Sequence, residues 1–100
     1  LINNTLFAAQ LGVLREAVAF GNRVGVDEAG LLQAVGHGSG ASRAAEIVGT
    51  RGSVQEFIDS VAEFIGKDVA VVRQIAAETG NDLGLLEPLI GSVVHAESAQ

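Results

Sequence analysis

The sequence has no cysteine, one proline and few positive charges, and each shortage excludes a class of protein. Without cysteine the chain forms no disulfide and offers no thiolate, which fits a reducing cytoplasm. A single proline and 48% hydrophobic residues indicate a globular domain and not a disordered segment. Six Lys and Arg against twelve Asp and Glu give a net charge of −6, which disfavours nucleic acid and anionic membrane surfaces as partners. We therefore expect a cytoplasmic protein.

Long uncharged apolar runs are also missing. Residues 1–20 are the most hydrophobic stretch, but polar and charged side chains keep it short of the roughly 18 apolar residues that a membrane span needs; they are Asn3, Asn4, Gln10, Arg15 and Glu16. The stretch has neither a basic leader nor a convincing cleavage site, so we expect no signal peptide. One hundred residues without an internal repeat or linker predict a single domain.

The hydrophobic pattern predicts helices throughout. No segment alternates with period two for long enough to form a strand, whereas helical spacing and glycine stops recur. We expect an all-α fold of five or six helices around a long, mostly buried first helix. The predicted helices cover residues 1–24, 27–36 with Asp27 as cap, 41–48, a short helix after Ser53 that runs into a long one near 60–79, and a last helix with Pro88 in its first turn. Residues 97–100 are expected to fray.

The first predicted helix is apolar around most of its circumference. Its large apolar side chains are Ile2, Leu6, Phe7, Leu11, Val13, Leu14, Val18 and Phe20. A helix of this kind must be surrounded, and only four or five short helices are present to surround it. We therefore expect a second subunit or another domain to cover part of it. The alternative is the central helix of a small bundle.

Two residues, Asn4 and Lys67, are candidates for binding a small molecule. Asn4 lies inside the first helical turn and not at a capping position, so its amide either orients a substrate or is satisfied by a facing helix. Lys67 is the only lysine and suits a carboxylate or carbonyl group. An i,i+4 pair with Glu63 on a solvated face is the plainer interpretation of Lys67.

Asp68 is the third candidate, because it falls near the centre of the apolar stripe of its helix. A carboxylate in that position needs a partner. The possible partners are backbone donors at a helix N-terminus, an arginine such as Arg15, and the amides of Asn3 and Asn4. Asp68 then serves either as a buried tie between helices or as a residue that orients a neighbouring site residue.

Other motifs carry less information. The turn at residues 38–42 precedes a predicted helix, but no strand precedes it and no GK[ST] follows, so loop and cap chemistry is favoured over phosphate binding. His37 and His95 show no metal-ligand spacing, and we expect no metal. No Ser/His/Asp arrangement or close carboxylate pair is credible.

Six fragments, in order along nearly the whole chain, together resemble a known family. They are Leu1-Ile2-Asn3-Asn4, Glu16-Ala17, Gly25-Val26-Asp27, Gly38-Ser39-Gly40-Ala41-Ser42, Lys67-Asp68 and Pro88. They resemble the C-terminal helical domain of the β-hydroxyacid dehydrogenases. This family includes 3-hydroxyisobutyrate dehydrogenase, tartronate semialdehyde reductase and succinic semialdehyde (glyoxylate) reductases, with 6-phosphogluconate dehydrogenase a more distant member.

The resemblance implies an oxidoreductase that acts on small β-hydroxyacids or semialdehydes with NAD or NADP. The family's helical domain supplies substrate-binding residues and the dimer interface. By the match, Asn4 holds the substrate, Lys67 lies by the cofactor and the substrate carboxylate, and Asp68 and Ser42 support the site. The catalytic lysine of the family, a general acid/base, falls immediately before Leu1 and on the same helix face as Asn4.

The sequence departs from the family in two places. Residues 1–100 contain no dinucleotide-binding half with its GxGxxG, and the final helix and tail of the family are missing. We therefore expect residues 1–100 to be one substrate and dimerisation domain that is inactive alone, works with its own N-terminal Rossmann domain and forms at least a dimer. The residues that decide between NAD and NADP belong to the dinucleotide-binding half.

Two alternatives stay open. Imine reductases share the architecture without the catalytic lysine, so a residue other than lysine before Leu1 would contradict the hydroxyacid assignment. The second alternative is a non-catalytic helical interaction module. An open reading frame that begins at Leu1 would favour it.

Overall fold

Five helices make up the computed structural model of the chain, which describes residues 1–94, and this range contains no strand. The helices are α1 (Ile2–Arg23), α2 (Glu28–Gly36), α3 (Arg43–Arg51), α4 (Val54–Glu78) and α5 (Leu86–Gly91). The predicted all-α class is therefore confirmed. The predicted fraying of residues 97–100 and the prediction for His95 lie outside the described residues.

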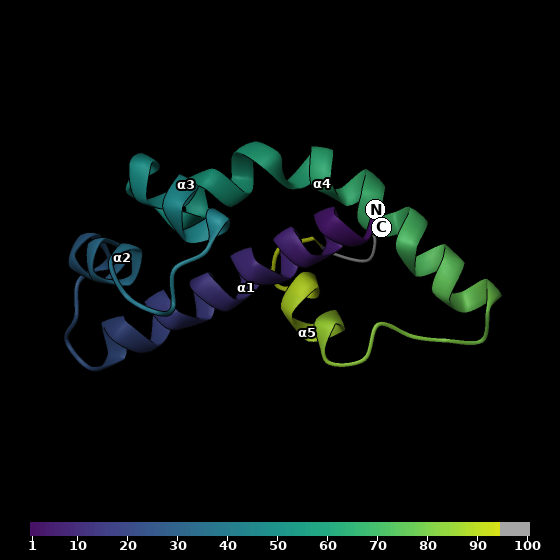
Figure 1. Ribbon diagram of the computed structural model, residues 1–100, viewed down its shortest axis with the longest axis horizontal. Helices are drawn as coiled ribbons and strands as arrows, with labels where there is room; N and C mark the ends of the chain where they lie inside the picture. The colour runs from purple at the N-terminus through teal and green to yellow at the C-terminus, as the bar shows by residue number, and fades with distance from the viewer. Residues whose placement is uncertain (95–100) are drawn as a thin grey trace.

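The long first helix organises the other four. Figure 1 shows α1 running through the molecule, with α4 across its first turns, α2 beside its other end, α3 between α2 and α4, and α5 on the opposite side from α4. Contacts join α1 to each of the other helices, and α2 packs mainly on α1 and α3. The helices enclose a core whose largest fully buried side chains are Leu11, Val48, Val69 and Ile90.

Helix caps confirm the predicted starts. Asp27 accepts a hydrogen bond from the Gly30 amide at 3.1 Å and opens α2, and Ser53 accepts one from the Glu56 amide at 3.2 Å and opens α4. A residue of another helix completes the start of α4, because Glu28 Oε2 accepts a hydrogen bond from the Val54 amide at 2.8 Å. Satisfying these first amides fixes both helix ends, since an α-helix cannot bond them internally.

Two predicted boundaries were wrong. The short helix after Ser53 and the long helix near 60–79 are one continuous helix, α4, because Phe57, Ile58, Ile65 and Val69 form a single buried face. The third helix covers Arg43–Arg51 and not residues 41–48, since Ser42 is its cap and the chain turns only at Gly52, where φ is +81°. No helix among residues 1–94 is both long and apolar enough to cross a membrane.

The inner side of α1 combines small residues with three of its large apolar side chains, Leu11, Leu14 and Val18. Ala8 is fully buried, and Gly12 lies so close to α5 that an added Cβ would stand 2.2 Å from the Leu89 carbonyl oxygen. Arg15 donates a hydrogen bond to the carbonyl oxygen of Ser92, which is the C-cap of α5. Small residues therefore let α5 dock closely on α1.

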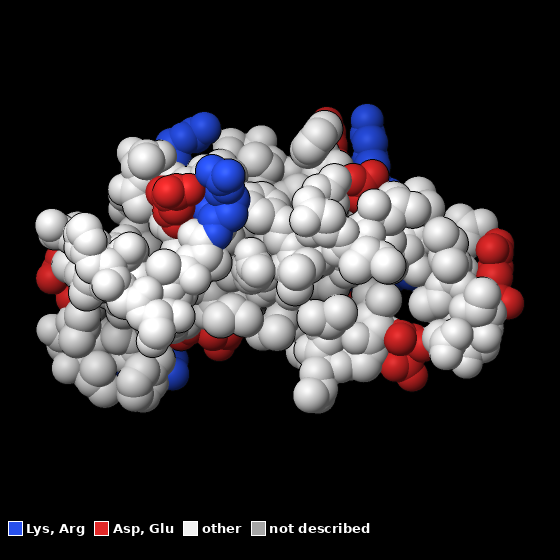
Figure 2. All heavy atoms as spheres, viewed as in Figure 1, with Lys and Arg blue, Asp and Glu red and all other residues white. Residues whose placement is uncertain are grey.

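One apolar face of α1 stays open. Ile2, Leu6, Val13 and Phe20 are 82%, 47%, 51% and 58% exposed, and they repeat every three to four residues or multiples of that spacing. The other helices therefore bury only one side of α1, so the predicted, mostly buried first helix is not fully covered within this chain. Figure 2 shows one side of the whole molecule, on which charged side chains lie mainly toward the margins and the middle is largely uncharged.

Candidate functional site

Two of the residues selected from the sequence meet where α1 crosses α4. Asn4 Nδ2 donates a hydrogen bond of 2.5 Å to Asp68 Oδ2, across 64 residues of sequence. Both residues are half-buried. The prediction that an amide of the Asn3-Asn4 pair would be the partner of Asp68 is confirmed for Asn4, whereas Arg15, another possible partner, binds Ser92 instead.

The pair lies at the rim of the core. Ala8, one turn after Asn4, is fully buried, and so is Val69, the neighbour of Asp68. Asp68 is at the edge of the buried stripe and not near its centre as predicted, because Phe64 on that side of α4 is 72% exposed. The half-buried position leaves one side of the pair accessible to a ligand while the helices hold the backbone of both residues.

Lys67 stands next to the pair, about 100° further round α4. The residue is exposed. The ion pairs among residues 1–94 are Arg43–Glu46 and Arg73–Glu87, so the expected pair of Lys67 with Glu63 is not formed in the structure. Lys67 is thus exposed to solvent, one residue before Asp68 in α4.

Ser42 is placed by capping chemistry. Its Oγ accepts a hydrogen bond from the Ala45 amide at 3.0 Å and starts α3. Ser42 also lines a groove of about 500 Å³ together with Asn3 and other residues of α1, namely Leu6, Phe7 and Gln10. The structure therefore brings Ser42 toward the start of α1 on the side of Asn3.

A second groove lies between the start of α1 and the second half of α4, and its α4 residues were not selected from the sequence. Its volume is about 690 Å³, and it is lined by Leu1, Ile2, Asn3, Val72, Ile75, Ala76, Thr79 and Asn81. Val72 and Ile75 follow Asp68 by four and seven residues, so they lie on the same face of α4. That spacing was the signal in the sequence that could have placed Val72 and Ile75 on the side of Asp68. An apolar groove beside a polar pair suits a small ligand with one polar end.

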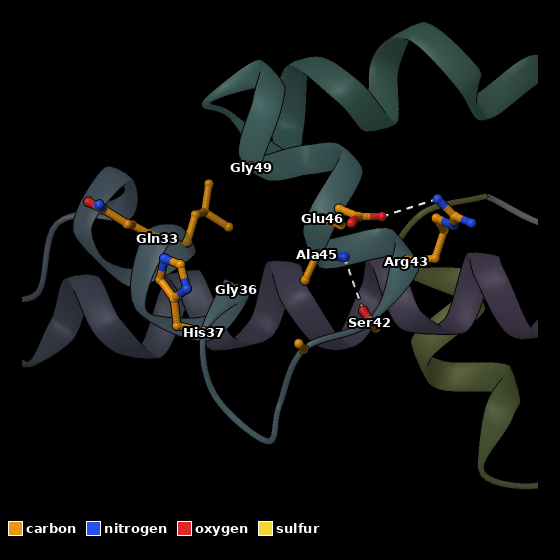
Figure 3. A pocket seen from close by; sticks show the side chains of 10 residues that line it. Gln33, Gly36, His37, Ser42, Arg43, Ala45, Glu46 and Gly49 are labelled. Carbon is orange, nitrogen blue, oxygen red and sulfur yellow. Dashed lines mark hydrogen bonds and ion pairs between the residues drawn. The ribbon is translucent and has the colours of Figure 1, made fainter.

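His37 belongs to a different place in the fold. It lines a groove of about 530 Å³ between α2 and α3, with Gln33 and Glu46 (Figure 3). The Arg43–Glu46 ion pair of 3.1 Å lies at the same groove. This groove shares Ala41, Ser42 and Arg43 with the groove that Asn3 lines. Within residues 1–94 no group of three His, Cys, Asp or Glu side chains is placed to hold a metal ion.

The fold and the pair define a class of protein: a helical domain with a candidate small-molecule site at the edge of its core. A family model described as NAD-binding of NADP-dependent 3-hydroxyisobutyrate dehydrogenase matches residues 1–96. The chain therefore belongs to this family, and the resemblance to β-hydroxyacid dehydrogenases is confirmed at that level. Membership indicates NAD(P)-dependent dehydrogenase chemistry. Searches of curated proteins and of solved structures gave no significant match.

Proposed function

We propose that the chain is the C-terminal helical domain of an NAD(P)-dependent oxidoreductase that acts on small β-hydroxyacids or their semialdehydes. The Asn4–Asp68 hydrogen bond supports this proposal most directly. It joins the asparagine motif at the start of α1 to the Lys-Asp motif of α4, two motifs that the family resemblance assigns to one substrate site. The family match over residues 1–96 supports the same assignment.

The residues around the pair fit an anionic cofactor and an anionic substrate. Lys67 is exposed, and it would hold either an anionic group of NAD(P) or the substrate carboxylate. Asn4 would orient the substrate, and the groove along Val72 and Ile75 would receive its apolar part. When bound, the nicotinamide supplies the ring that accepts or gives a hydride. The lysine expected immediately before Leu1 would move the proton at the substrate oxygen.

Kinetics of the full-length enzyme test this proposal. The protein that contains residues 1–100 is assayed with 3-hydroxyisobutyrate and either NAD or NADP, and the expected result is formation of reduced nicotinamide. Lys67→Gln should raise the KM for substrate or cofactor about tenfold, because a charged hydrogen bond is lost. Arg23→Gln, which removes an exposed charge at the far end of α1, is the matched control.

The residue before Leu1 and the substrate that the full-length protein turns over distinguish the two alternatives, imine reduction and a non-catalytic interaction module. A residue other than lysine before Leu1, together with reduction of the cyclic imine 1-pyrroline, would replace the hydroxyacid proposal by imine reduction. Turnover of neither substrate with either cofactor would contradict an oxidoreductase role and leave the helical interaction module.

Self-association is the second part of the proposal. The open apolar face of α1, formed by Ile2, Leu6, Val13 and Phe20, supports a homodimer in which a second copy covers it. Light scattering of the full-length protein should give at least a dimer. Val13→Glu should shift it toward monomer, whereas Glu56→Gln, on an exposed part of α4, should not. A strictly monomeric protein at high concentration would contradict this part alone.

A further inference from the structure

We propose that Asp68 is a positioning residue that makes Asn4 a hydrogen-bond acceptor in the site. The inference rests on the proposed function and deepens it, because it states which chemical group Asn4 recognises. That group is an O–H or N–H donor, and not a carboxylate.

The polarity of the contact carries this inference. An ionised carboxylate has only acceptor atoms, whereas an asparagine amide has a donor nitrogen and an acceptor oxygen. Asn4 must therefore turn Nδ2 toward Asp68, where the two atoms are 2.5 Å apart. Because Nδ2 and Oδ1 lie on opposite sides of the planar amide, Oδ1 then points away from Asp68. The reverse orientation would place two acceptors in contact.

The free end of the amide is available to a ligand. Among residues 1–94, no hydrogen bond to Asn4 Oδ1 is formed, and the residue is only half-buried. A carbonyl oxygen in this position attracts a donor and repels a carboxylate. The substrate carboxylate would then need a cation as its partner. Lys67, the residue before Asp68, is the lysine that could bind it.

Two sources could supply the donor, and both share the same chemistry. One is a hydroxyl group of the substrate. The other is the ammonium group of the lysine expected four residues before Asn4, which would lie on the same face of α1. In either case the hydrogen-bond chain runs from the donor to Asn4 Oδ1, and from Asn4 Nδ2 to Asp68.

A swap of the two side chains tests the inference in the full-length enzyme. Asn4→Asp alone brings two carboxylates together, and Asp68→Asn alone lets the Asn4 amide take either orientation. Each should lower kcat/KM about 10- to 100-fold. The double variant Asn4→Asp/Asp68→Asn restores one hydrogen bond with its direction reversed and still presents an acceptor at residue 4. It should recover most of the lost activity.

The swap distinguishes an acceptor from a donor, because aspartate at residue 4 has no N–H. Recovery of both activity and melting temperature in the double variant supports the inference. Recovery of the melting temperature without activity would overturn it, since Asn4 would then act through its amide protons. Unchanged activity in both folded single variants would also overturn it. Asn22→Asp, the same exchange at an exposed asparagine of α1, should keep the activity of the unaltered enzyme.

Two further measurements separate the sources of the donor. If the substrate hydroxyl is the donor, Asn4 variants should lose the preference for binding 3-hydroxyisobutyrate over isobutyrate. If the lysine is the donor, that preference should persist and the pH profile of kcat should move. Wild-type turnover of 3-hydroxyisobutyrate or of 1-pyrroline decides the proposed function. The ratio of kcat/KM in the double variant to kcat/KM in the single variants, on whichever substrate the wild type uses, tests the inference.

Discussion

The first helix crosses two others in different ways. At the crossing with α4, near the start of α1, a half-buried amide and a carboxylate form a hydrogen bond beside an open groove. At the crossing with α5, Gly12 brings the backbones together and Arg15 donates a hydrogen bond to the carbonyl oxygen of Ser92, the C-cap of α5. The α5 crossing is therefore expected to hold the fold together, whereas the α4 crossing is expected to carry the chemistry.

Adding a side chain at Gly12 should have the largest effect on stability. Gly12→Ala places a methyl group 2.2 Å from the Leu89 carbonyl oxygen, so α5 must move. We expect the free energy of unfolding to fall by about 1–3 kcal/mol, as in other overpacked contacts. Chemical denaturation followed by circular dichroism measures it.

Gly49→Ala is the control for this variant. Gly49 lies within α3 and has open space around its Cβ position, so alanine should raise stability by roughly 0.5–1 kcal/mol through helix propensity alone. Equal effects of the two substitutions would show that the α1–α5 approach is not close.

Removing the hydrogen bond at the end of α5 should have a smaller effect. Arg15→Met keeps much of the aliphatic side chain but loses the bond to the Ser92 carbonyl oxygen. A loss of about 1 kcal/mol is expected, the usual net contribution of one intramolecular hydrogen bond, because this one is only partly buried. The same denaturation experiment checks it, with Arg23→Met as an exposed control. A loss in the control as large as that in Arg15→Met would contradict the assignment.

The ion pair between α4 and the start of α5 should contribute less still. Arg73 binds Glu87 through two hydrogen bonds of 3.0 and 2.5 Å, with the Arg73 and Glu87 side chains 21% and 45% exposed. A double-mutant cycle with Arg73→Met and Glu87→Gln should give a coupling of about 0.5–1 kcal/mol. Added salt should reduce it. A coupling of zero at low salt would show that this ion pair does not stabilise the fold.

The smallest effect on stability is expected at the polar crossing. Asn4→Ala removes one half-buried hydrogen bond and raises helix propensity, so the free energy of unfolding should change by less than about 1 kcal/mol. Activity of the full-length enzyme should nevertheless fall about tenfold or more. Thermal denaturation and kinetics of the same preparation test the contrast. A large loss of stability with unchanged activity per folded molecule would reverse the roles of the two crossings.

Local features of the fold were predictable from sequence because they depend on neighbouring residues. Asp27 and Ser53 were recognised as caps, and each makes the expected backbone hydrogen bond. Asn4 was named as a possible partner of Asp68 because a carboxylate on an apolar stripe needs a donor. These inferences require only helix geometry and the cost of burying a polar group.

Features that depend on how helices dock were not predictable. The inner side of α1 carries Ala8 and Gly12, but small residues and large apolar residues both suit an interior, so the sequence did not distinguish the two faces. The position of Asp68 at the edge of its stripe, and the groove beside Val72, follow from where α1 lies against α4. A single sequence does not specify where α1 lies along α4.

The most direct test of the central assignment combines the site and the chemistry in one assay. Formation of reduced nicotinamide from 3-hydroxyisobutyrate is measured for the full-length protein and for its Asn4→Ala variant at matched folded concentration. We predict turnover by the wild type with NAD or NADP and a loss of about tenfold or more in the variant. Equal rates for the two proteins, or no turnover by the wild type, would contradict the assignment.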